Sequence, residues 1–103
     1  MPVHRLLLIL GLGLLPVLAA QASSQLALEK GCYSCHGEPP RRGAPTLAQL
    51  AADYARYRGQ PDAPRRLADK LHAGGLFGHI AAHERINQQE CEALMRWLID
   101  GAP

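Results

Sequence analysis

Two cysteines and a histidine stand within five consecutive residues, and this cluster limits what the chain can fold into more than any other feature. The segment reads Cys32-Tyr33-Ser34-Cys35-His36. On a helical turn, thiols three positions apart lie on the same face, and the histidine follows the second thiol directly. Four kinds of site use two cysteines at this spacing: a redox dithiol, a zinc site, a structural disulfide and a covalently attached haem.

The rest of the sequence separates these four possibilities. A redox dithiol of the thioredoxin type needs a βαβ context, and no stretch of this chain alternates like a strand. A zinc site needs two more ligands; Cys91 and a distant histidine could be recruited, but no second paired motif exists. A disulfide would leave His36 unexplained. Because C-x-x-C-H is the haem-attachment signature, we predict that Cys32 and Cys35 bind one haem c covalently and that His36 ligates its iron.

The first 22 residues have the pattern of a secretory signal peptide. Arg5 gives a short positive start, residues 6–20 are almost wholly apolar, and residues 20–22 read Ala-Gln-Ala. A membrane anchor would need about 20 apolar residues, and the glycines and proline within this run weaken a helix. We predict a signal peptide over 1–22, a mature domain over 23–103, a periplasmic or otherwise exported location, and no stable membrane insertion after cleavage.

The composition of the chain excludes several classes of function. A domain of 81 residues (23–103) has too little volume for a large core, so it usually depends on a disulfide, a metal or a cofactor. The formal net charge is only +2, and no basic run is interleaved with aromatic residues, so we predict no nucleic-acid partner. The chain shows no acid–base or nucleophile constellation, and we predict a monomer that is not an enzyme by itself.

The hydrophobic periodicity predicts an all-α fold. The closing helix has the clearest start, because Asn87 and Glu90 form a capping-box pattern, and Asp62 is the predicted N-cap of the helix before it. Two proline- and glycine-rich or irregular loops, 37–45 and 76–85, separate the helices. We expect about four short helices, covering residues 25–30, 46–57, 63–73 and 87–100.

These elements, taken in order, resemble the small monohaem class I cytochromes c, and the resemblance covers nearly all of the chain from Ser23 to Ala102. The segment 43–45 (Gly-Ala-Pro) matches a Gly-x-Pro-like segment that lies beneath the haem in that family. The segment 67–75 (LADKLHAGG) is similar to a helix that ends in two glycines. The closing helix carries Trp97 where the family has an aromatic residue that packs on the first helix.

The resemblance implies a cytochrome c-like fold wrapped around one covalent haem. It implies that the protein carries single electrons between redox protein partners. It also implies that the backbone carbonyl of Pro45 accepts a hydrogen bond from the His36 ring, with a distance from Nδ1 to oxygen within about 3.2 Å.

The chain departs from the family at the sixth iron ligand. The usual ligand is a methionine in the loop before the closing helix, but residues 76–85 contain His79 and His83 and no methionine. Met95 lies on the inner stripe of the closing helix and is predicted to be a core residue. We predict His83 as the distal ligand, with His79 as the alternative and an open or water-filled position as a third possibility.

His83 is preferred because two alanines precede it and because Glu84 is close enough in sequence to orient its ring. His72, near the end of the preceding helix, is predicted to be a surface residue. The missing methionine also keeps a second function open, a haem protein whose labile distal site binds O₂, CO or NO as a sensor or minor catalyst. Cys91 is predicted to be a small core residue.

Overall fold

The computed structural model describes residues 23–74 and 79–103. The predicted signal peptide and residues 75–78, the last three of which begin the second predicted loop, lie outside this part of the chain. The described residues contain helices and no strand, so the all-α prediction is confirmed. Residues 23–29 are helical, and the elements that follow are α2 (Tyr33–His36), α3 (Leu47–Tyr54), the 3-10 helix η1 (Ala55–Tyr57), α4 (Ala63–Ala73), α5 (Ala81–Glu84) and α6 (Gln88–Ile99).

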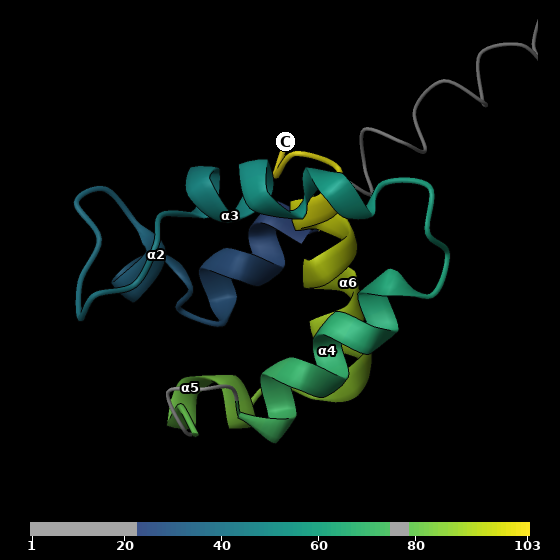
Figure 1. The fold of residues 1–103 in the computed structure, drawn as a ribbon. Helices are drawn as coiled ribbons and strands as arrows, with labels where there is room; N and C mark the ends of the chain where they lie inside the picture. The colour runs from purple at the N-terminus through teal and green to yellow at the C-terminus, as the bar shows by residue number, and fades with distance from the viewer. Residues whose placement is uncertain (1–22, 75–78) are drawn as a thin grey trace, which may run out of the picture.

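Helix α6 is the centre of the fold. It runs through the middle of the molecule, with α3 across its C-terminal end and α4 beside it (Figure 1). Its inner stripe is buried as predicted, and Met95, only 5% exposed, is a core residue. Full burial of one such side chain stabilises the fold by about 1.5–3 kcal/mol. The buried core residues are Ala27, Ala51, Ala63, Leu67, Ala68, Ile86, Cys91, Leu94, Met95, Trp97, Leu98 and Ile99.

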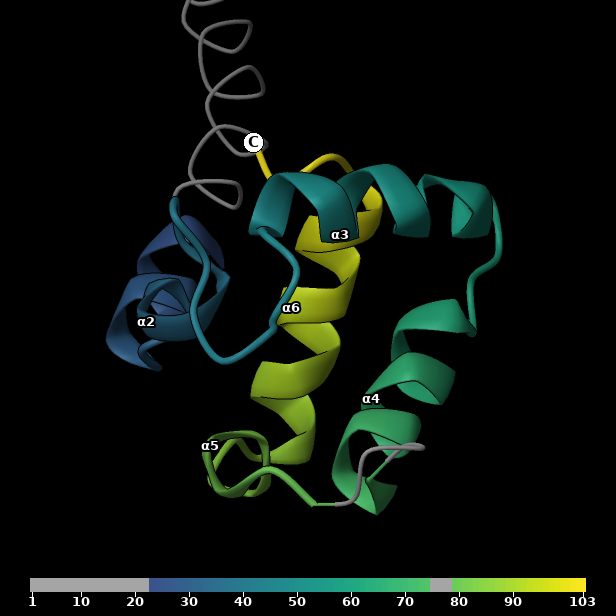
Figure 2. The same cartoon turned by 60° about the vertical axis from the view of Figure 1, so that its left-hand side comes forward.

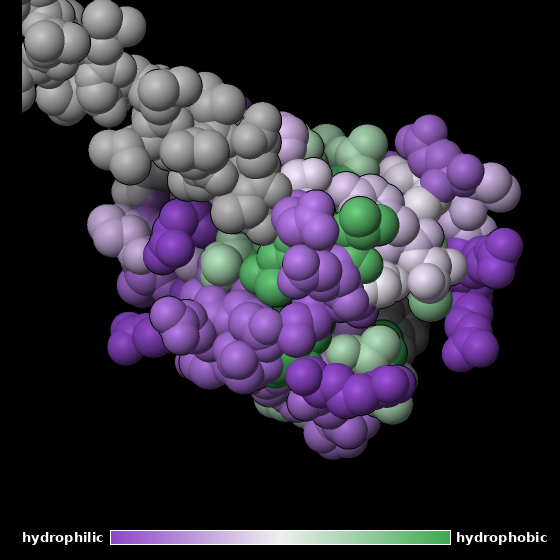
Figure 3. Space-filling view, turned by 180° about the vertical axis from the view of Figure 1, so that it is seen from behind, coloured by the Kyte–Doolittle hydropathy of each residue, from purple (hydrophilic) through white to green (hydrophobic). Residues whose placement is uncertain are grey.

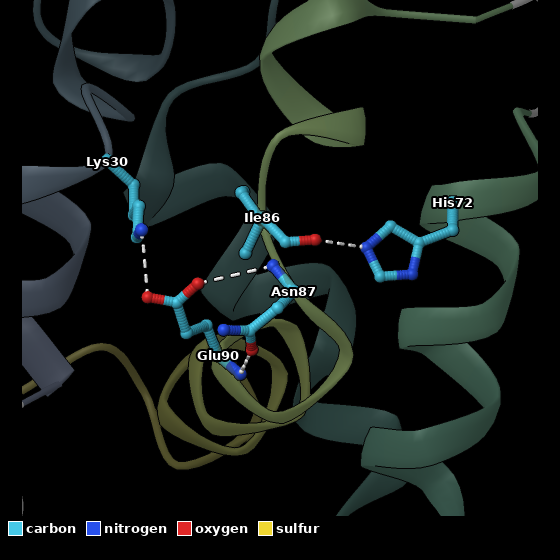
Figure 4. A network of polar contacts seen from close by, with 5 residues as sticks. All are labelled: Lys30, His72, Ile86, Asn87 and Glu90. Atoms are coloured by element: carbon cyan, nitrogen blue, oxygen red, sulfur yellow. Dashed lines mark hydrogen bonds and ion pairs between the residues drawn. The ribbon is translucent and has the colours of Figure 1, made fainter.

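The predicted capping box at the start of α6 is confirmed. The backbone N–H of Glu90 donates to Asn87 Oδ1 at 2.8 Å, and the backbone N–H of Asn87 donates to Glu90 Oε1 at 3.2 Å (Figure 4). The second carboxylate oxygen of Glu90 lies 2.8 Å from Lys30 Nζ. One glutamate therefore both begins α6 and connects it to the end of the first helical segment.

Asp62 is the N-cap residue of α4, as predicted, but its side chain does not cap the helix. The Asp62 side chain makes no capping hydrogen bond, because the backbone of this residue is already helical (φ −91°, ψ −6°). Its carboxylate instead pairs with Arg66 Nε at 3.0 Å, one turn further along the helix. Pro64, in the first turn of α4, has no backbone N–H that would need a capping partner.

The irregular loop predicted over residues 76–85 was also wrong in part. Residues 81–84 form the one-turn helix α5. The carbonyl of Ile80 accepts from the backbone N–H groups of His83 (3.0 Å) and Glu84 (3.2 Å), and alanine has the highest helix propensity of any residue. Helix α5 lies on the same side of α6 as α2, as Figure 2 shows after a 60° turn. The expected number of about four helices therefore missed α2 and α5.

Candidate haem site

The two thiols of the motif lie on one turn of helix. Gly31, in the left-handed region with φ +74°, separates this turn from the preceding helical segment. The backbone N–H of Cys32 still donates to Ala27 O at 3.0 Å, and that of His36 donates to Cys32 O at 2.9 Å. Cys32 and Cys35 are both free and partly exposed. The arrangement presents two thiols on one face, with the histidine immediately after them.

The loop after α2 holds the ring of His36. His36 Nδ1 donates a hydrogen bond to the carbonyl of Pro45 at 2.7 Å, so the distance expected from the sequence is confirmed. The loop is folded back by hydrogen bonds from Arg41 N to Cys35 O (2.9 Å) and from Ala44 N to Arg41 O (3.0 Å). Such a bond to the second ring nitrogen is typical of metal-bound histidines. It leaves Nε2 of His36 free to bind a metal.

Gly37 is a site residue that the sequence analysis missed. A Cβ atom at this position would lie 2.5 Å from the backbone oxygen of Tyr33, which is too close for any non-glycine residue without a backbone shift. The chain leaves α2 through this crowded point immediately after His36. A glycine directly after the histidine was the available signal, and it was interpreted only as part of a loop.

The ring that faces His36 belongs to His83 on α5. The rings of His36 and His83 are parallel to within 9°, and their centroids are 6.2 Å apart. A metal–histidine bond is about 2 Å long and the ring centroid lies about 1 Å beyond the bound nitrogen, so two imidazoles on opposite sides of one metal would have ring centroids about 6 Å apart. Burial, followed by the neighbouring His36 and His72, lowers the pKa of His83. This shift favours the neutral ring, in which one nitrogen has a lone pair that can bind a metal.

His79 is placed differently from His83. Its Nδ1 lies 2.9 Å from a carboxylate oxygen of Glu84, and its side chain is 65% exposed. Glu84 therefore does not orient His83, contrary to the prediction, because Glu84 pairs with His79. Adjacent residues on a helix do not face each other, so a carboxylate next to His83 points away from that ring.

His72 was wrongly predicted to be a simple surface residue. It is half-buried on the last turn of α4. Its Nε2 donates to the carbonyl of Ile86 at 2.6 Å, and its Nδ1 lies 3.1 Å from Gln88 Oε1. The ring therefore bridges α4 to the segment between α5 and α6.

The two remaining sulfur-containing candidates lie in the core. Cys91 is fully buried, as predicted, and burial raises the pKa of its thiol to about 11. A thiol with so high a pKa carries almost no thiolate at pH 7 and is a poor metal ligand or nucleophile. Met95 is buried on the same stripe of α6.

The residues that face each other fit a haem iron better than a bare metal ion. In the described part of the chain, no group of three or more histidine, cysteine, aspartate or glutamate side chains is placed to hold a metal. Two histidines are fewer ligands than a protein-bound metal ion usually takes. A haem iron needs only axial ligands from the protein, because the macrocycle supplies the others.

The distribution of exposed apolar side chains also fits a haem. Of the three large hydrophobic residues exposed in the described ranges, Tyr33 (42%) belongs to α2 and Ile80 (49%) directly precedes α5. These are the elements that carry the two facing histidines. On the face opposite the view of Figure 1, hydrophobic residues occupy small areas among mostly hydrophilic ones (Figure 3). Each of the two elements that carry the facing histidines thus contains or adjoins an exposed apolar side chain.

Comparison with known proteins identifies the family. The chain is 32% identical over 81 residues to cytochrome c-552 of Hydrogenobacter thermophilus, a match that covers 76% of this chain and 80% of the relative. It is 28% identical over 83 residues to cytochrome c2 of Rubrivivax gelatinosus, covering 74% of this chain and 93% of that protein. No family model matches the chain, and no solved structure does.

The chain belongs to the class I c-type cytochromes. It is a monohaem cytochrome with the helical fold of that family and with covalently bound haem c as its cofactor. Its function is that of an electron carrier. The relatives lend no support to the alternative of a small-ligand sensor.

Proposed function

We propose that the protein is an exported single-electron carrier whose haem is attached at Cys32 and Cys35 and whose iron is ligated by His36 and His83. The observation that carries the distal assignment is the pair of parallel imidazole rings with centroids 6.2 Å apart. The exposed His79, paired with Glu84, is the less suitable donor.

When bound, haem supplies an iron that exchanges one electron without any change in the bonds of the protein. The chain's own residues hold the axial ligands in place. The Pro45 carbonyl fixes the orientation of His36 through the 2.7 Å hydrogen bond and raises the basicity of its ring. If His83 holds the iron together with His36, no coordination site would be left open for a small ligand. We therefore favour electron transfer over the binding of O₂, CO or NO.

Two histidine ligands also set the expected range of reduction potential. A methionine ligand raises the potential of a cytochrome c, and histidine is the stronger donor to ferric iron. We therefore propose a lower potential than that of a methionine-ligated relative. The partners would be redox proteins, and the carrier would act as a monomer.

The proposal of export rests on the sequence of residues 1–22, with a mature domain over 23–103. No helix in the described part of the chain is both long and apolar enough to cross a membrane. Mass spectrometry of the purified protein should show a chain that begins near Ser23 and carries one haem.

The distal assignment is tested by two matched substitutions, His83→Ala and His79→Ala. Each holoprotein is examined by absorption spectroscopy in both oxidation states and by CO binding to the reduced form. The native protein should be low-spin and should lack the weak near-infrared band of an iron–methionine bond. His83→Ala should become high-spin and bind CO rapidly, whereas His79→Ala should resemble the native protein. If only His79→Ala becomes high-spin, the distal ligand is His79; if the native protein is already high-spin, the distal position is open.

A further inference from the structure

The helix that carries His83 is held by little apolar burial. Helix α5 has only four residues, and none of them is buried. Its own hydrogen bonds close a single turn, and among the described helices it packs mainly against α4. An element with so few buried contacts opens at low free-energy cost. Contacts at its ends therefore have a large influence on where His83 lies.

One such contact is made just after α5. Ile86, three residues beyond His83, is buried, and its carbonyl accepts the 2.6 Å hydrogen bond from His72 Nε2 (Figure 4). The adjacent Asn87 and Glu90 form the capping box of α6. The segment that leaves α5 is thus fixed from one side by α6 and from the other by the ring of His72.

The ring of His72 is itself held in place by a second contact. Its Nδ1 lies 3.1 Å from Gln88 Oε1, and Gln88 Nε2 donates to Asp69 Oδ1 at 3.1 Å. A carboxylate can only accept, so the amide nitrogen of Gln88 faces Asp69 and its oxygen faces His72 Nδ1; this second contact is a hydrogen bond when Nδ1 carries a proton as well as Nε2. Asp69 lies on α4, three residues before His72. Gln88, at the start of α6, therefore contacts two residues of α4, Asp69 and His72.

We infer that His72 is a positioning residue for the distal ligand: by holding the Ile86 carbonyl, it keeps α5 where the His83 ring faces His36. This inference rests on the proposed ligation of iron by His83. Without the bond to Ile86, α5 would still form its single turn, but His83 would leave the iron more often.

The test uses the reduced holoprotein and CO as the probe. At saturating CO, the rate of CO binding equals the rate at which His83 leaves the iron. His72→Leu removes both ring nitrogens while keeping an apolar side chain that favours a helix. It should raise this rate about fivefold, the factor that corresponds to one ordinary hydrogen bond. His72→Gln, whose amide can still donate to Ile86, should restore most of the native rate.

Lys70→Leu is the matched control, because Lys70 is an exposed residue in the last turn of the same helix. It should leave the rate unchanged. If His72→Leu does not yield folded protein, Gln88→Leu, which removes the acceptor opposite Nδ1, should raise the rate in the same direction by a smaller factor.

An unchanged rate of CO binding in the folded His72→Leu protein would overturn the inference. If His72→Leu does not fold, an unchanged rate in Gln88→Leu would overturn it. An equal rise in His72→Leu and His72→Gln would also overturn it, because the hydrogen bond would then not be the cause. His83→Ala separates this failure from failure of the proposed ligation. If His83→Ala leaves the low-spin spectrum intact, His83 is not the ligand; if it turns the spectrum high-spin while His72→Leu has no effect, only the positioning role is wrong.

Discussion

His36 and His83 face each other, yet the two sides of the site hold them by different means. His36 follows a helical turn that also carries both cysteines, and its ring is bonded to a carbonyl nine residues away. His83 lies on a one-turn helix with no buried residue, next to a segment held by His72 from another helix. His36 is thus placed by one continuous piece of chain, and His83 by contacts between separate pieces.

This difference predicts how each side responds to change. The proposed attachment at two cysteines, the proposed ligation by His36 and the bond to Pro45 all lie within residues 32–45, so a substitution there affects several of them together. The distal side depends on side chains that can be exchanged one at a time. The His36 side of the site should therefore tolerate little change, whereas His83, the proposed distal ligand, should be replaceable.

The largest effect is expected from removing the attachment. Cys32→Ser or Cys35→Ser should lower the yield of holoprotein on the order of tenfold, because a cofactor that binds only the folded chain stabilises it by mass action. The yield and the mass of the denatured protein are the measurements. Cys91→Ala is the matched control, and its product should keep one haem mass. Haem that extracts freely from the native protein into acidic organic solvent would refute covalent attachment.

Exchange of the distal ligand should leave the fold intact and change the potential. In His83→Met, a thioether replaces the imidazole, and the reduction potential should rise on the order of 0.1 V, within the ~0.8 V range that axial ligands set. The near-infrared band of an iron–methionine bond should appear in the oxidised protein. The proximal counterpart, His36→Met, loses the bond to Pro45 as well and should accumulate little holoprotein. Equal tolerance of both substitutions would contradict the comparison.

A smaller effect is expected where the chain leaves α2. Gly37→Ala places a Cβ atom 2.5 Å from the backbone oxygen of Tyr33, and the strained backbone should lower the free energy of unfolding by about 1–3 kcal/mol. Gly59→Ala is the control, since its φ of +80° is unfavourable for alanine but no atom lies within 4 Å of the new Cβ. Urea unfolding should detect both changes. Only Gly37→Ala should also alter the haem spectrum, because only it adjoins His36.

The parts of the structure that the sequence predicted are those specified by neighbouring residues. The C-x-x-C-H turn and the Asn87–Glu90 capping box each need only a few consecutive positions, and both form as expected. The stripe of α6 was predictable because a helix of twelve residues repeats its pattern over several turns.

The parts that the sequence analysis missed depend on geometry or on distant contacts. A helix of four residues such as α5 is too short to show a periodic pattern. Because α5 was not predicted, the sequence could not show that Glu84 pairs with His79 rather than with His83. The pairing depends on the direction in which each side chain leaves the helical turn. The partner of His72 is fourteen residues away, and no pattern of charges or apolar residues indicates a bond between a ring and a backbone carbonyl.

The smallest effect is expected at the ion pair that connects the first helical segment to α6. Two hydrogen bonds lower the pKa of Glu90 below its ordinary value of 4.5. The larger contribution comes from Lys30, and the next comes from the backbone N–H of Asn87. Because the folded-state pKa lies below the unfolded one, the carboxylate stabilises the fold above about pH 4.5, and this contribution disappears as the pH falls through the lower, folded-state value. Glu90→Gln should therefore lower the urea midpoint slightly at pH 7 and leave it close to the native value at low pH. Glu92→Gln on the same helix makes the same change of charge outside the capping network and should not reproduce this pattern. A difference between native protein and Glu90→Gln that persists undiminished in acid would show that the amide disturbs the start of α6 by its shape, and that the charge of Glu90 contributes nothing.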